Sequence, residues 1–186
     1  MSHKVVSGNF VSYVHHYVQG GDIMPMPAGA DAITIIEFAD VAHLAASKVS
    51  APYLDFVGPD EDNFRDEAGS CAYRAVPQIV QERANDTLVK LLVFHQQRSD
   101  DFAIQFQTRF VDISQSFGHI ISNQLTPIGP PHAGDFVVMD EIYLIDPTVA
   151  ENTCRDLKTM AVAMGLAPIT VLITQSKSFV QGMKNV

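Results

Sequence analysis

Apolar residues group along the chain into short runs that predict strands, and the segments between them are rich in glycine, proline and acidic residues. The first run, residues 5–18, is rich in β-branched and aromatic residues and predicts a strand whose two faces are both partly covered. A loop is expected at 19–32, because Pro25 and Pro27 remove backbone donors and the neighbouring glycines permit unusual dihedral angles. We expect these two segments to be peripheral.

A strand followed by a helix is predicted next. Residues 33–39 form a short apolar run, and Asp40 is placed to cap a helix. The apolar stripe of that helix comprises Val41, Leu44, Ala45 and Lys48 or Val49. A further strand is expected at 52–57, before an acidic loop at 58–70.

Residues 73–96 fit two patterns. Val76, Ile79 and Val80 fall on one helical face with residues further along, whereas residues 87–94 alone suit a fully buried strand. We favour a helix to about residue 85 and then a strand, and the alternative of a helix through 86–96 stays open. Strict alternation at 102–110 predicts a half-exposed strand, with a hairpin turn at 96–101.

The C-terminal part has the clearest pattern. A short helix is expected at 113–125 and a loop at 126–134, followed by a strand at 136–145. Asp146 and Pro147 then begin a helix that Gly165 ends, and Val149, Thr153, Leu157, Met160 and Met164 form its apolar face. A strand at 167–174 and a short closing helix complete the chain.

The segment 136–174 is therefore a predicted strand–helix–strand unit, and a right-handed crossover implies that its two strands pair in parallel. Together these elements predict an α/β or α+β fold, in which a mixed β-sheet is covered by helices. The length of 186 residues suits a single globular domain spanning 1–186 with one core.

Composition narrows the classes of partner. The chain is 47% hydrophobic and 18% charged, as globular proteins are, and its net charge is −9. Because phosphate binding needs clustered Lys and Arg, we expect neither a nucleic acid nor an anionic membrane as partner. No run approaches the roughly 18 apolar residues that span a bilayer, and no secretory signal is recognisable, so a cytoplasmic location is expected.

Two carboxylates, Asp140 and Glu141, directly follow four apolar residues, and Thr174 and Gln175 end the next strand. On these residues the segment 136–176 resembles the second half of a RecA-like ATPase core. The resemblance implies that Asp140 and Glu141 hold Mg²⁺ through water and polarise the attacking water, and that Thr174 and Gln175 lie where that family senses the γ-phosphate. The chain departs from the family because it has no GxxxxGKS/T loop to cradle phosphates.

A simpler interpretation of these residues is that a buried strand ends in polar side chains where its backbone reaches water. On that interpretation Asp140, Glu141, Thr174 and Gln175 form a polar cluster at the sheet edge, with no cofactor and no metal. The seven histidines support the absence of a metal, since they show no HxH, HExxH or HxxE spacing. No GxSxG elbow or activated cysteine marks a catalytic nucleophile.

The acidic loop contains a second candidate site. It concentrates Asp60, Glu61, Asp62, Asp66 and Glu67 around one arginine, in a spacing that does not match a calcium-binding loop. We interpret it as a solvated charged segment that could dock a basic partner. The function expected from the whole sequence is that of a non-catalytic binding protein, meaning an adaptor, a chaperone-like protein or a structural subunit, with a protein partner or a second copy. The alternative is a Mg²⁺ and nucleotide site that another chain completes.

Overall fold

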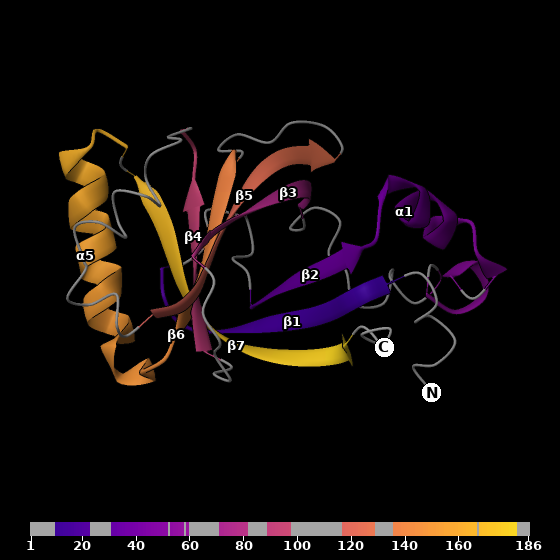
Figure 1. Cartoon of the computed structure of the whole chain (residues 1–186), viewed down its shortest axis with the longest axis horizontal. Coiled ribbons are helices and arrows are strands. Elements are labelled where there is room, and N and C mark those ends of the chain that lie inside the picture. Colours follow the sequence, from indigo (N-terminus) through magenta and orange to yellow (C-terminus); the bar gives the residue numbers. More distant parts are fainter. Residues whose placement is uncertain are drawn as a thin grey trace. The chain divides into compact units, whose positions relative to one another are not determined.

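The structure is a computed structural model that describes residues 10–22, 31–51, 53–57, 59, 71–81, 89–97, 117–128, 136–166 and 168–181. Figure 1 shows its strands, which are β1 (Phe10–Gly21), β2 (Ala32–Phe38), β3 (Ala72–Gln81), β4 (Val89–His95), β5 (Phe117–Ile128), β6 (Val138–Leu144) and β7 (Ile169–Gln181). Its helical segments are α1 (Val41–Lys48), the π-helical turn η2 (Tyr53–Val57), the 3-10 turn η3 (Pro147–Val149) and α5 (Ala150–Ala163).

The strands belong to one hydrogen-bonded sheet in the order β2-β1-β7-β4-β6-β5-β3. Every pairing whose register is described is antiparallel. The predicted α/β or α+β fold with a mixed sheet covered by helices is therefore wrong, because strands dominate the described residues and the helices are few and short. The physical reason is that several segments with helical spacing pair as strands instead.

Three predicted helices and one predicted strand are corrected. The described parts of the helices expected at 73–85 and 113–125 belong to strands β3 and β5, which pair with each other, and the described part of the expected closing helix belongs to β7. The described part of the strand expected at 52–57 is the helical turn η2. In each strand, cross-strand hydrogen bonds override a weak local preference for helix. The strand predicted at 102–110 lies outside the described residues.

The predicted strand–helix–strand unit exists, but its two strands do not pair. Strand β4 pairs in antiparallel orientation with β6 on one side and with β7 on the other. Strands β6 and β7 are consequently parallel to each other with β4 inserted between them. The sequence contains no local mark of this insertion, because β4 precedes β6 in the chain by about forty residues, a separation that hydrophobic periodicity does not record.

The predicted cap of α1 is confirmed, since Asp40 accepts a hydrogen bond from the backbone N–H of His43 at 2.8 Å. Asp146 accepts one from that of Thr148 at 2.9 Å, but it caps the 3-10 turn η3, which leads into α5, whose own N-cap Val149 makes no side-chain cap bond. Gly165 follows α5 with a φ of 70°, and the predicted apolar face of α5 contributes Thr153, Leu157 and Met160 to the interior. The predicted stripe of α1, in contrast, is largely exposed, and Ser47 is the buried side chain of that helix.

The chain divides into two compact units. Unit 1 comprises Met1–Tyr17, Asp31–Ser70 and Ser176–Val186, and unit 2 comprises Val18–Ala30 and Cys71–Gln175. Figure 1 shows α5 beside the strands of unit 2, and the core of this unit combines side chains of α5 with side chains of β4, β5, β6 and β7. Its members include Leu91, Val93, Phe117, Ile120, Ile142, Leu144, Leu157, Met160 and Val171.

Candidate functional site

The two carboxylates at 140 and 141 lie in the middle of β6 and are both buried, with 2% and 5% of their surface exposed. Because successive side chains of a strand point to opposite faces, Asp140 shares the face of Ile142 and Leu144, which belong to the core under α5. Glu141 points to the other face. The structure therefore separates the two residues that the sequence places side by side, and neither lies at a strand end.

Glu141 is the centre of a buried polar cluster formed by three strands. Its Oε2 atom accepts a hydrogen bond from Nζ of Lys90 on β4 at 2.6 Å, and its Oε1 atom accepts one from Nδ2 of Asn123 on β5 at 3.0 Å. Nζ of Lys90 also donates to the Tyr143 hydroxyl at 3.1 Å and lies 4.3 Å from the centre of that ring. Both carboxylate oxygens of Glu141 thus have partners inside the protein, as buried charges require.

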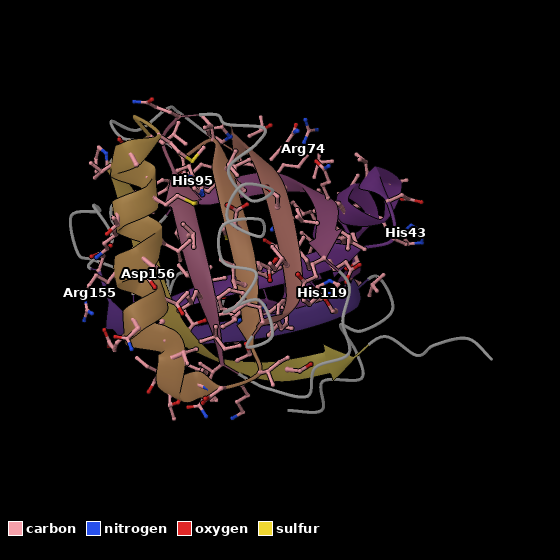
Figure 2. All side chains as sticks on the ribbon, turned by 60° about the vertical axis from the view of Figure 1, so that its left-hand side comes forward. His43, Arg74, His95, His119, Arg155 and Asp156 are labelled. Carbon is pink, nitrogen blue, oxygen red and sulfur yellow. The ribbon has the colours of Figure 1, made fainter. Side chains whose placement is uncertain are left out.

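The phenol of Tyr143 extends this cluster toward β5. Burial raises the pKa of the Tyr143 hydroxyl above its usual value, while Lys90 lowers that pKa and Glu141 raises it. The hydroxyl consequently stays protonated at neutral pH. The ring of His119, labelled on β5 in Figure 2, meets the Tyr143 ring edge to face at 5.5 Å between centres.

The internal hydrogen bonds determine what this cluster can do chemically. A general base needs an acceptor that is free to take a proton, and a metal ion needs free oxygen ligands. Glu141 offers neither, because its two oxygens are occupied by Lys90 and Asn123. The arrangement therefore links β4, β5 and β6 through hydrogen bonds that engage both oxygens of Glu141.

A second buried pair lies on the opposite face of β6. Nε2 of His95 is 2.8 Å from Oδ2 of Asp140, and both side chains are 3% exposed. Figure 2 shows His95 near the end of β4. The other carboxylate oxygen of Asp140, Oδ1, is buried and has no hydrogen-bond partner. Leu91, Val93 and His95 are spaced two residues apart and therefore point to the same side of β4. Because Leu91 and Val93 belong to the apolar core of unit 2, the pair of His95 and Asp140 lies on the same face of the sheet as that core.

The other two predicted site residues, Thr174 and Gln175, also point to opposite faces of the sheet. Thr174 is fully buried, and its hydroxyl donates to the backbone carbonyl of Lys90 at 3.1 Å. Because Lys90 is the register partner of both Thr174 and Tyr143, Thr174 lies on the face of Glu141. Gln175 points to the other face and is exposed. The structure thus associates Glu141 and Thr174 with Lys90 and does not bring all four predicted residues together.

A Mg²⁺–nucleotide site of the kind implied by the RecA-like resemblance needs the carboxylates of Asp140 and Glu141 free to reach one metal ion and its water. Their opposite orientation and their separate partners do not fit that requirement. No group of three or more His, Cys, Asp or Glu side chains in the described ranges is arranged to hold a metal ion. The five acidic residues of the predicted docking loop lie outside the described residues.

Sequence reasoning missed four members of these clusters, namely Lys90, His95, Asn123 and Tyr143. One signal was available, because a lysine inside the apolar run Leu88–Phe94 is rare unless it is paired. Its partner could not be identified from the sequence, since Glu141 is 51 residues away and the pairing depends on the register between β4 and β6.

The fold and the site define an antiparallel sheet protein with an ion pair buried between central strands. The chain matches no protein-family model, and neither the curated proteins nor the solved structures contain a significant match to it. Within the described residues, no helical segment combines the length and the apolar composition that crossing a bilayer requires.

Proposed function

We propose that the chain is a non-catalytic structural subunit of a larger protein assembly, and that unit 1 is the part that other subunits cover. The observation that carries the proposal is the absence of an apolar interior in the described part of unit 1. Its buried side chains there are His16 and Ser47, which are both polar, whereas all buried apolar side chains of the described residues belong to unit 2.

The surface of unit 1 supports the same proposal. Unit 1 has several large apolar side chains that are at least 36% exposed. They are Val11, Tyr17, Ile36, Val41, Val49 and Leu54. Burial of apolar area is the main favourable term in folding, so the described part of unit 1, which exposes such residues and buries no apolar side chain, gains little stability by itself. A protein surface laid over them supplies the missing burial.

The short helix α1 of unit 1 also leaves large apolar side chains exposed. It has 8 residues, and isolated helices shorter than about 12 to 15 residues are marginal in water, so packing must hold them. In α1, Val41 is 66% exposed and the C-cap residue Val49 is 73% exposed. The cluster around Glu141 in unit 2, in which both carboxylate oxygens are occupied, is consistent with a structural rather than a catalytic role. The cytoplasmic location expected from the sequence belongs to this proposal.

Sedimentation of the full chain in an extract of the cells that produce it tests the proposal. We expect the chain to sediment in particles well above its own mass of 20.4 kDa. The double variant Val41→Lys/Val49→Lys should sediment as free chain, because each lysine would place an unpaired charge inside a covered surface. Purified alone, this variant should unfold at the same temperature as the wild type, since both side chains are exposed.

The matched control is Val162→Lys on α5, where the wild-type valine is 68% exposed in unit 2. This variant should remain in the large particles. A wild-type chain that sediments at its own mass in that extract would contradict the proposed function.

A further inference from the structure

Strand β2 is a terminal strand of the sheet, and its outer backbone edge has a composition suited to strand pairing. It pairs with β1 and comes first in the strand order, so among the described residues it has a ladder on one side alone. Its sequence, AITIIEF, contains three isoleucines and no proline. The outer edge of a terminal strand offers backbone N–H and C=O groups to any other strand that can approach.

The two polar side chains of β2, Thr34 and Glu37, do not protect its outer edge, because both contact side chains of β1. The Glu37 carboxylate accepts a hydrogen bond from the Ser12 hydroxyl at 3.1 Å. The Thr34 hydroxyl lies 2.9 Å from Nδ1 of His15. Charged side chains and prolines are the usual means by which proteins protect exposed strand edges, and within β2 the single charge is directed toward its existing partner.

The other terminal strand, β3, differs in this respect. Pro77 lies in its middle, opposite Asn123 of β5. Because proline has no N–H, it is tolerated in a terminal strand where its nitrogen faces away from the ladder, and it interrupts pairing on that outer side. The chain thus protects the edge of β3 and leaves the edge of β2 without such protection.

We infer that β2 pairs in antiparallel orientation with β2 of a second copy of this chain, across a two-fold axis at Ile35. This inference rests on the proposed function, because it names a second copy as a partner of unit 1. Centred on Ile35, each residue of 33–37 finds a partner in the second copy. Two-fold pairs are self-complementary, so one strand edge supplies both halves of the contact.

The charges and faces of β2 are compatible with this register. Glu37 lies opposite Ile33 of the second copy, so the two carboxylates do not oppose each other. Thr34 lies opposite Ile36, and Ile35 lies opposite itself. Each pair joins residues of the same face, since side chains alternate along both strands. The apolar side chain of Ile36, 39% exposed in the single chain, gains a neighbour in the pair.

Equilibrium sedimentation of the purified full chain over a wide concentration range tests the inference. We expect the wild type to reach twice its mass of 20.4 kDa as the concentration rises. Ile35→Lys should weaken the pair roughly tenfold or more, because two like charges then lie directly opposite each other in the sheet. Ile35→Glu should do the same, and an equimolar mixture of the two variants should associate again as a mixed pair.

Ile79→Lys on β3 is the control, since Ile79 is 58% exposed on the protected terminal strand. It should leave association unchanged. A second measurement needs no substitution: hydrogen exchange of the wild-type amides of β2 should slow at high concentration, while exchange of the β3 amides should not change.

Three outcomes would overturn the inference. These are a wild type that stays monomeric at all concentrations, Ile35 variants that associate as the wild type does, or two variants that fail to associate when mixed. A wild type that is monomeric when purified but sediments in large particles in cell extract would overturn the β2 pairing and leave the proposed function intact. The experiments therefore distinguish a failure of the β2 pairing from a failure of the proposed function.

Discussion

The ammonium of Lys90 and the carboxylate of Glu141 meet at 2.6 Å between neighbouring strands, each side chain being less than a tenth exposed. Removing water from two charges is costly, and their attraction together with the added hydrogen bonds from Asn123 and to Tyr143 offsets that cost. Breaking such a pair leaves an uncompensated charge inside the sheet, so its members are coupled in their effect on stability.

Lys90→Met and Glu141→Leu should each lower the free energy of unfolding by about 3 to 5 kcal/mol, because each leaves the other charge buried alone. The double variant should regain most of this loss, since both charges are then absent. Urea unfolding of the four proteins measures the coupling. Arg155→Met is the control, because Arg155 is exposed on the side of α5 that faces away from the strands (Figure 2), and a change within about 0.5 kcal/mol is expected. Additive losses in the double variant would contradict the coupling.

Gly20 and Gly21 are neighbouring glycines of β1 that differ in the space available for a side chain. Gly21 has a φ of 91°, and a Cβ atom added there would lie 2.3 Å from the backbone oxygen of Val171. At Gly20 an added Cβ would make ordinary contacts at 3.5 Å or more. Gly21→Ala should therefore destabilise the protein by more than the roughly 1 kcal/mol expected for backbone strain alone, whereas Gly20→Ala should be close to neutral. Thermal unfolding distinguishes them, and equal losses would show that the close approach of β1 and β7 is not as described.

Leu157 anchors α5 to the strands of unit 2 and is fully buried. Leu157→Ala should lower the free energy of unfolding by about 2 to 5 kcal/mol, the cost of removing buried methyl groups and leaving a cavity. Val162→Ala on the exposed side of the same helix is the control and should change stability little. An unfolding midpoint that Leu157→Ala leaves in place would remove α5 from the core.

Cys154 is a free buried thiol on α5, and burial, with a smaller contribution from Glu151, raises its pKa to about 11. In a Cys71→Ser background, iodoacetamide at pH 8 should therefore alkylate Cys154 far more slowly in the folded chain than in urea, because the thiolate is the reactive form.

The same pKa predicts a dependence of stability on pH. The unfolded thiol loses its proton near its ordinary pKa of 9.0, below the folded value of about 11. The contribution of Cys154 to stability is thus fully present below the unfolded pKa and is lost as pH rises through the folded one. The free energy of unfolding of wild type minus that of Cys154→Ala should fall over this alkaline window. A difference that is flat across it would contradict the raised pKa.

Local signals in the sequence predicted the parts of the fold that local physics controls. Asp40 caps α1 as expected, and Asp146 caps the 3-10 turn that leads into α5, because a side-chain acceptor next to free backbone N–H groups acts within a few residues. Strands β2, β4 and β6 were also predicted, since each is a compact apolar run. These features need no information about distant parts of the chain.

The errors arise where distant pairing decides the structure. Strand β3 was predicted as a helix because Val76, Ile79 and Val80 have helical spacing, yet Val76 and Ile79 are more than half exposed and their spacing reflects no buried face. The partners of the candidate site residues were not predicted for a related reason. The sequence shows Asp140 and Glu141 as neighbours, but the partners that define their roles, His95 and Lys90, are contributed by β4 through a register that is not visible locally.

The position of β4 between β6 and β7 has a consequence for the order of events during synthesis. The segment that contains β6, α5 and β7 cannot close a ladder by itself, because both of its strands use β4 as their shared neighbour. A fragment that begins at residue 136 should therefore remain unfolded, although it contains the clearest local pattern in the chain. On the ribosome, β4 is made before β6 and β7, so the nascent chain passes through a stage in which this strand, buried in the folded protein, has neither of these neighbours.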